Sequence, residues 1–171
     1  MKIKIIILVL GICFFCIPSI AHNSRILDEY SFAKDNFKWV KKKFYYYLDY
    51  KCMKKKIDPI FALAIAQTES GGKNVISRKN RNGSRDYGRF QVNSVHMPKR
   101  PRKLLNYKIN IDKAMYYLGL ALKKAKGDLG LACIYYNAGL NCNVGKYRRS
   151  KKLMKYPKKI LRIYRSLTVS F

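Results

Sequence analysis

One glutamate stands where its carboxyl group could do acid chemistry. The chain holds only two glutamates, Glu29 and Glu69, and Glu69 ends an apolar run, residues 60–66, just before Gly71-Gly72. A carboxylate in the last turn of a buried helix meets the negative end of the helix dipole and loses hydration, and both effects raise its pKa. The pattern predicts a carboxyl group that is still protonated near neutral pH, as a general acid must be. The alternative is a glutamate that merely ends a helix at the surface.

A second acid, Asp86, follows seventeen residues later within the turn-rich stretch "SRKNRNGSRDYGRFQVN", residues 77–93. An acid at a buried helix end that faces a polar turn region is typical of a sugar-cleaving cleft. Asp86 stands just before Tyr87-Gly88, where an aspartate commonly accepts backbone N–H bonds within a turn. We therefore expect Asp86 to support the site rather than to react.

The elements that must position these acids are mainly helical. Asp58 as N-cap, Pro59 in the first turn and Gly71-Gly72 at the end predict a helix that is apolar on all sides and buried in the middle of the domain. Residues 77–93 predict a small β-hairpin. Further helices are expected as one or two within residues 24–56, then at 112–126 after a basic linker with Pro98 and Pro101, at 129–137 between Asp128 and Gly139, and at 151–167.

The N-terminus has the pattern of an export signal. Residues 1–4 are basic, residues 5–17 are apolar, and residues 19–21 are small enough for cleavage after Ala21. Thirteen apolar residues are few for a membrane span, so a permanent anchor is the alternative. The sequence predicts an exported protein of the periplasm or cell envelope, with no stable membrane span after cleavage.

The charge is strongly positive, with 37 Lys and Arg against 9 Asp and Glu, or +28. Such a field favours anionic polymers or surfaces. A nucleic acid is disfavoured as partner, because the protein is expected outside the cytoplasm and carries no nucleic-acid motif. Two explanations stay open: solvated lysine-rich faces, or steering towards an anionic cell envelope.

Cysteine and histidine usage argues against a metal enzyme. His22 and His96 lie far apart, and neither stands among cysteines at the spacing of zinc ligands, so we expect no metal and no cofactor. Beyond the leader an odd number of cysteines remains, which permits one bridge. Cys133 and Cys142 are predicted to form it, because Gly139 lets the chain turn back between them. A buried free Cys133 is the alternative.

Three motifs in order, "ESGG", "NRNGSRDYGRFQVN" and "YYNAG", resemble the soluble lytic transglycosylase (SLT) domain of the lysozyme-like superfamily. The nearest resemblance is to small exported enzymes that accompany secretion, pilus and conjugation machines. It covers about residues 51–139 and implies a mainly α, goose-lysozyme-like fold with a small β-hairpin insert. Residues 22–50 would form an N-terminal helical extension, and residues 51–171 the catalytic domain with its C-terminal helix. Arg89-Phe90 departs from the family's usual Leu-Met and would put a cation at the cleft.

The resemblance also assigns roles to single residues. Glu69 matches the catalytic acid and base. Matches to residues that line the cleft and bind substrate are Asp86, Gln91, Asn93, Tyr136 and Asn137. In the family the hydroxyl that matches Tyr136 lies close to the acid. Hydrogen bonds at helix ends and turns are expected instead of sugar contacts for Ser70, Ser77 and Asn80, and core packing for Tyr135.

The function implied is a peptidoglycan lytic transglycosylase that cleaves the β-1,4 bond between N-acetylmuramic acid (MurNAc) and N-acetylglucosamine (GlcNAc) and leaves a 1,6-anhydro-MurNAc end. Its partners would be the glycan strands and, as a further candidate, a secretion or flagellar assembly. Three alternatives remain: a hydrolytic lysozyme that uses Glu69 and Asp86, a non-catalytic wall-binding module, and a cationic protein that binds nucleic acid or membrane.

Overall fold

The computed structural model describes residues 24–168, so the predicted leader lies outside the described residues. The chain divides into two units, Met1–Lys38 and Trp39–Phe171. In the first unit residues 24–36 are helical, and Arg25 and Glu29 form an exposed ion pair at 3.7 Å.

The centre of the second unit is the helix α3, Pro59–Ser70, which the sequence predicts correctly. The Asp58 carboxylate accepts the N–H of Ile60 at 2.7 Å and caps the helix. Gly71, at a φ of 64°, ends it in the left-handed conformation, with its N–H donated to the carbonyl of Gln67. The residues from Phe61 to Ala66 are at most 1% exposed, so α3 is buried as expected.

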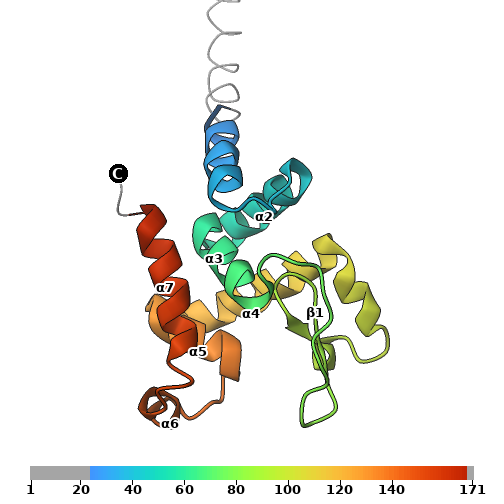
Figure 1. Ribbon diagram of the computed structural model, residues 1–171, viewed down its shortest axis with the longest axis vertical. Helices are drawn as coiled ribbons and strands as arrows, with labels where there is room; N and C mark the ends of the chain where they lie inside the picture. Colours follow the sequence, from blue (N-terminus) through green and yellow to red (C-terminus); the bar gives the residue numbers. More distant parts are fainter. Residues whose placement is uncertain (1–23, 169–171) are drawn as a thin grey trace, which may run out of the picture. The chain divides into compact units, whose positions relative to one another are not determined.

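The fold is mostly helical, and four longer helices pack on α3 or on each other (Figure 1). The elements are α2 (Lys42–Lys55), α4 (Tyr107–Lys124), α5 (Leu129–Ala138) and α7 (Lys155–Thr168). α2 and α7 pack on α3, α4 packs on α2 and α5, and α5 packs on α7. The expected helices within residues 24–56 are thus two, one in each unit.

A small hairpin interrupts the helices. Its strands are β1 (Asp86–Tyr87) and β2 (Val92–Asn93), which pair antiparallel, Asp86 with Asn93 and Tyr87 with Val92. Asn110 on α4 holds the hairpin turn: its side-chain amide donates to the Tyr87 carbonyl at 2.9 Å and its oxygen accepts the N–H of Phe90 at 3.0 Å. The Asn110 amide, on a residue that is 2% exposed, is therefore one of the contacts that fix the hairpin to the helical core.

Some helix boundaries differ from the predicted ones. α4 begins at Tyr107 instead of residue 112, because the Asn106 side chain accepts two backbone N–H groups and caps it. α7 begins at Lys155 instead of residue 151, which keeps Pro157 in the first turn, where proline is tolerated. The remaining short elements, which the sequence does not predict, are η1 (Ser94–His96), η2 (Pro101–Leu105) and α6 (Val144–Arg149).

The predicted disulfide between Cys133 and Cys142 is not formed: along the described part of the chain every cysteine is a free thiol. Cys133 is fully buried on α5, whereas Cys142 lies partly exposed in the loop that follows. Burial raises the pKa of the Cys133 thiol to about 12, so it packs as a small apolar residue. This is the alternative left open for Cys133.

Within residues 24–168, no helix combines the length and the apolar character that crossing a membrane requires. The same residues contain no group of histidine, cysteine and carboxylate side chains arranged to hold a metal ion.

Candidate active site

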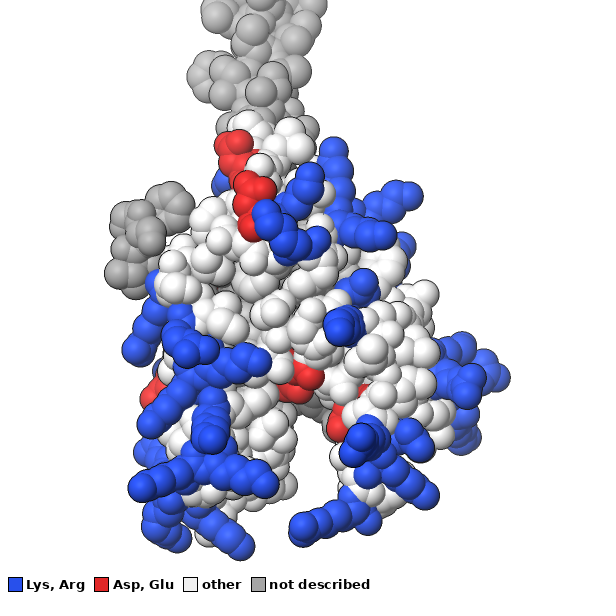
Figure 2. Space-filling model, viewed as in Figure 1, with Lys and Arg blue, Asp and Glu red and all other residues white. Residues whose placement is uncertain are grey.

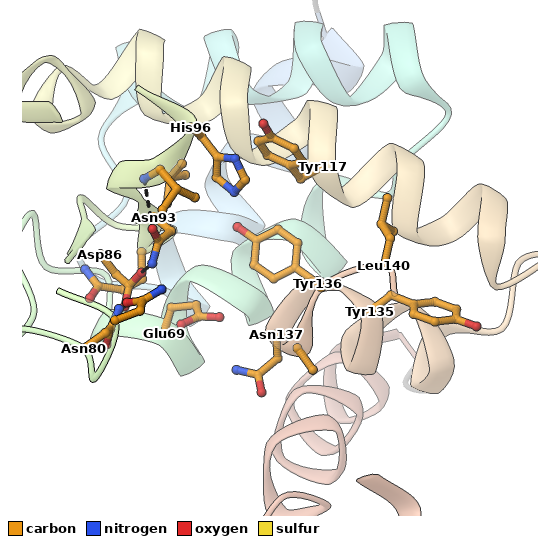
Figure 3. Close-up of a pocket in the computed structure, with 16 residues that line it drawn as sticks. Glu69, Asn80, Asp86, Asn93, His96, Tyr117, Tyr135, Tyr136, Asn137 and Leu140 are labelled. Carbon is orange, nitrogen blue, oxygen red and sulfur yellow. Dashed lines mark hydrogen bonds between the residues drawn. The ribbon is translucent and has the colours of Figure 1, made fainter. Parts of the chain in front are cut away.

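A cleft of about 600 Å³ opens in the second unit, and Glu69 lies in it at the C-terminal end of α3 (Figure 3). One wall comes from the hairpin and the turn before it, and the other from the end of α5 and the loop that follows. Besides Glu69 the cleft is lined by Asn80, Asn82, Asp86, Gln91, Val92, Asn93, Val95, His96, Tyr117, Tyr135, Tyr136, Asn137, Ala138, Gly139 and Leu140. The structure thus gathers the five predicted substrate-binding residues around Glu69.

Glu69 has the properties that its position in the sequence predicts. Its pKa is raised from 4.5 to about 7, chiefly because burial removes hydration from the carboxylate. The charge of Asp86 raises the pKa further, while a hydrogen bond from the hydroxyl of Tyr156 on α7 lowers it. The carboxyl group can therefore give up a proton near neutral pH and take one back.

Asp86 is held by side-chain amides. Asn93 donates to its Oδ1 at 2.7 Å and Asn80 to its Oδ2 at 3.1 Å, and the Ser77 hydroxyl lies 3.5 Å from Oδ2. These donors replace the backbone N–H groups that the sequence suggested for this aspartate. Both oxygens of Asp86 therefore accept hydrogen bonds within the wall of the cleft. Figure 3 shows Asp86 and Asn80 beside Glu69.

Gln91 and Asn93 also hold the hairpin. The amide of Gln91 donates to the carbonyls of Gly88 at 2.7 Å and Val75 at 3.2 Å. The Asn93 oxygen accepts the N–H of Val95 at 3.0 Å and so caps η1. Because the amide nitrogen of Gln91 and both polar side-chain atoms of Asn93 bond the protein itself, these two side chains give the cleft a rigid wall.

The opposite wall comes from α5. Tyr136 and Asn137 both line the cleft. The Tyr136 hydroxyl donates to the carbonyl of Phe90 at 3.0 Å and so joins α5 to the hairpin turn. Its pKa is raised well above 10 by burial and by the charge of Glu69. The Asn137 oxygen accepts the hydroxyl of Tyr147 on α6 at 3.0 Å.

A family model, that of the transglycosylase SLT domain, matches residues 47–158, about two thirds of the chain. The chain belongs to the transglycosylase SLT domain family. A comparison with curated proteins gives no match. Family membership gives peptidoglycan as the substrate class and an activity of the lytic transglycosylase type.

The SLT domain extends further than the predicted span of residues 51–139, and the added part contributes to the site. It includes α6, whose Tyr147 bonds Asn137, and Tyr156 at the start of α7. Tyr136, whose hydroxyl is expected close to the acid, lines the same cleft as Glu69. The hydroxyl that bonds Glu69 is that of Tyr156, which the sequence does not predict. Burial and the charge of Glu69 raise the pKa of the Tyr156 hydroxyl well above 10. The hydroxyl therefore stays protonated while it donates a hydrogen bond to the Glu69 carboxylate.

Several residues differ from their predicted roles. Arg89 does not line the cleft: its guanidinium lies over the rings of Phe44, at 5.1 Å, and Trp39, at 5.9 Å. Tyr135 packs against the core and also reaches the cleft. His96 and Tyr117, which the sequence does not single out, close one end of the cleft with ring centroids 4.0 Å apart.

The small polar residues make the helix-end and turn hydrogen bonds expected of them, and Asn80 also lines the cleft. The Ser70 hydroxyl donates to the Arg89 carbonyl at 2.8 Å and ties the end of α3 to the hairpin turn. The Ser77 hydroxyl and the Asn80 amide bond within the hairpin wall, to Arg78 at 2.8 Å and Ser84 at 3.1 Å respectively.

Proposed function

We propose that this SLT domain cleaves the β-1,4 bond between MurNAc and GlcNAc and forms 1,6-anhydro-MurNAc, with Glu69 as both acid and base. Protonated Glu69 gives its proton to the glycosidic oxygen as the bond to C1 breaks. The resulting carboxylate takes the proton of the muramic 6-hydroxyl, whose oxygen bonds C1. Glu69 ends protonated, and no water is consumed.

The observation that carries this proposal is the state of the two carboxyl groups in the cleft. Glu69 has a pKa of about 7 and so can act in both protonation states at neutral pH. Asp86 has its oxygens bonded to Asn80 and Asn93. A hydrolase needs its second carboxylate as nucleophile or to activate water, whereas an intramolecular 6-hydroxyl needs neither.

The test is the mass of the products. We expect muropeptides released from purified murein to be lighter by one water than hydrolysis products and to lack a reducing end, by liquid chromatography with mass spectrometry. Reducing-end products from the unsubstituted protein would favour the hydrolytic lysozyme, with Asp86 as the second catalytic carboxylate.

Asp86→Asn should lower the rate about tenfold and leave the anhydro product unchanged. The new amide keeps one acceptor but turns an N–H group towards Asn80 or Asn93, so the hairpin wall loosens. Initial rates and product masses measured together check this. A change from anhydro to reducing-end products, or a loss of activity as large as that of Glu69→Gln, would contradict it.

Tyr156→Phe should move the alkaline limb of the pH profile to higher pH. The hydroxyl bond stabilises the Glu69 carboxylate and lowers its pKa, so removing it raises that pKa above about 7. Because the acid must be protonated for the first step, kcat/KM of the variant then falls only at a higher pH than that of the unsubstituted protein.

Tyr147→Phe is the matched control, because it deletes a hydroxyl that bonds Asn137 instead of Glu69. The alkaline limb of the pH profile of Tyr147→Phe should stay in place, whatever the rate of this variant. A Tyr156→Phe limb that coincides with that of the unsubstituted protein would show that the hydroxyl does not tune the acid.

The substrate also suggests where the protein acts. We propose that residues 1–21 direct it out of the cytoplasm to the cell envelope, where murein lies. Fractionation of cells that carry the full chain, with N-terminal sequencing of the envelope form, tests both the location and cleavage after Ala21.

A further inference from the structure

The interior of the cleft and its edges differ in charge. Its lining residues include two carboxylates, Glu69 and Asp86, and no lysine or arginine. In Figure 2 blue lysine and arginine side chains stand on both sides of the gap, with red side chains between them. We define the rim by six exposed cations: Lys79 and Arg81 on either side of Asn80, Lys124, and Lys146, Arg148 and Arg149 of α6.

On the hairpin side, cations alternate with lining residues. Asn80 and Asn82 face the cleft, and exposed Lys79 and Arg81 are their neighbours in the same turn. The turn is ordered, because the N–H of Asn80 bonds the Ser84 carbonyl at 2.7 Å. These two charges are therefore carried by a fixed loop at the edge of the cleft.

On the other side, two contacts tie the cations to the cleft wall. The Lys124 ammonium donates to the carbonyl of Leu140 at 2.6 Å and lies 5.3 Å from the centre of the Tyr135 ring, and both partners line the cleft. α6 is joined to Asn137 through buried Tyr147, which is flanked in the sequence by exposed Lys146 and Arg148.

The rim cations are not neutralised by the protein. Among residues 24–168, none of the six rim cations forms an ion pair with a carboxylate. Cations on both sides of a cleft repel one another, and an anion that lies between them offsets this repulsion. The arrangement is thus suited to a polymer ligand that lies along the cleft and carries negatively charged groups on both of its sides.

We infer that the rim binds the free carboxylates of the peptide stems, so that the substrate is glycan that still bears its peptides. This inference rests on the proposed function. The sugars around the scissile bond are uncharged once the lactyl group carries a peptide, so the glycan offers the rim no partner. The stems branch from the strand at each muramic residue and end in carboxylates, which places anions at the edges of the cleft instead of its floor.

Local contact and overall charge make different predictions. A net charge of +28 attracts any anionic surface, and this attraction falls when any cation is removed. Exposed charges farther apart than about 10 Å are largely screened at 0.1 M salt. At that salt, only cations close to the bound stems should affect binding.

The experiment measures binding separately from cleavage. Glu69→Gln protein is mixed with murein that is immobilised through its glycan strands, either intact or stripped of its stems by an amidase, and the bound fraction is measured at 0.1 M salt. Both preparations are first freed of phosphate polymers, and the lactyl carboxylates that the amidase leaves on the stripped glycan are converted to neutral methylamides, so that only the intact murein carries stem carboxylates. The rim variant is Lys79→Gln/Arg81→Gln/Lys146→Gln, and the matched control is Lys41→Gln/Lys43→Gln/Lys54→Gln, which removes three exposed cations on or next to α2, none of them in the cleft lining.

We expect the rim variant to bind intact murein roughly tenfold more weakly, at about twofold for each exposed contact, and the control variant less than twofold. Both should bind stripped glycan as the parent protein does. Equal losses in the rim and control variants, or an equal loss on stripped glycan, would overturn the inference alone. A parent protein that binds neither preparation would overturn the proposed function, and the inference with it.

Discussion

Glu69→Gln should reduce murein cleavage by roughly a thousandfold and leave the protein folded. A positioned acid or base contributes about 10²–10⁴-fold to a reaction, and here one group performs both transfers. Glutamine has the shape of the acid and keeps an oxygen that can accept the Tyr156 hydroxyl, but it cannot give or take a proton. Dye release from labelled murein at pH 7, with circular dichroism for the fold, measures both expectations.

The same substitution should stabilise the protein above pH 7. The pKa of Glu69 is about 7 in the folded chain and 4.5 for an ordinary glutamate, so the folded state binds the proton more tightly. As pH rises from 4.5 to 7, the unfolded state releases that proton first, and the folded state loses stability. A neutral glutamine avoids this loss, and we expect a gain of roughly 1–3 kcal/mol at pH 8.

The chain offers a matched control in its other glutamate. Glu29→Gln makes the same chemical change in the first unit, where the partner is Arg25 in an exposed pair. It should change neither the rate nor, by more than about 0.5 kcal/mol, the free energy of unfolding. If folded Glu69→Gln protein clears murein at the unsubstituted rate, Glu69 is not the catalytic acid and the wall-binding alternative gains.

What the sequence predicts well is local. α3 follows from Asp58 and Pro59 at one end and Gly71 at the other, all within reach of the helix they delimit. The hairpin follows from a run of turn residues, and Glu69 follows from its place on α3. In each of these examples the signal and the structure lie within a few residues of each other, so pattern and outcome agree.

What it misses depends on contacts between distant segments. Tyr156 lies 87 residues after Glu69, and its bond requires α7 to pack on α3. In the sequence it is one aromatic residue of an amphipathic helix. Cys133 and Cys142 show the opposite error: a short spacing permits a bridge, but it does not reveal that Cys133 faces the core. No pattern of residue types encodes either relation.

Asn110 is another such residue, and its loss should have a large effect on stability. We expect Asn110→Ala to lower the free energy of unfolding by about 3 kcal/mol. The substitution leaves the Phe90 N–H and the Tyr87 carbonyl without their partner in a buried place, and each such group costs about 1–3 kcal/mol. Urea unfolding followed by the fluorescence of Trp39, the chain's only tryptophan, measures this.

Asn36→Ala is the control for Asn110→Ala, because the Asn36 amide makes one hydrogen bond, to the Phe32 carbonyl at 2.9 Å, on an exposed part of the first unit. Its effect should stay within about 0.5 kcal/mol. A similarly small effect of Asn110→Ala would mean that the hairpin does not depend on this amide.

Gly88 gives a second, independent test of the contact between Asn110 and the hairpin turn. A Cβ at Gly88 would lie 2.5 Å from the Asn110 amide nitrogen, and the φ of 75° is one that L side chains rarely adopt. Gly88→Ala alone should therefore cost both the strain of that conformation, about 1–2 kcal/mol, and the collision with Asn110. In Asn110→Ala protein the collision disappears and only the strain remains.

The double variant should thus be more stable than the sum of the two single losses predicts, by about 1 kcal/mol or more. Additive losses would show that the hairpin turn and α4 are not packed against each other through this pair. Because Asp86, Gln91 and Asn93 all lie on the hairpin that this contact holds, the same cycle measured on murein cleavage would show how far the wall of the cleft depends on α4.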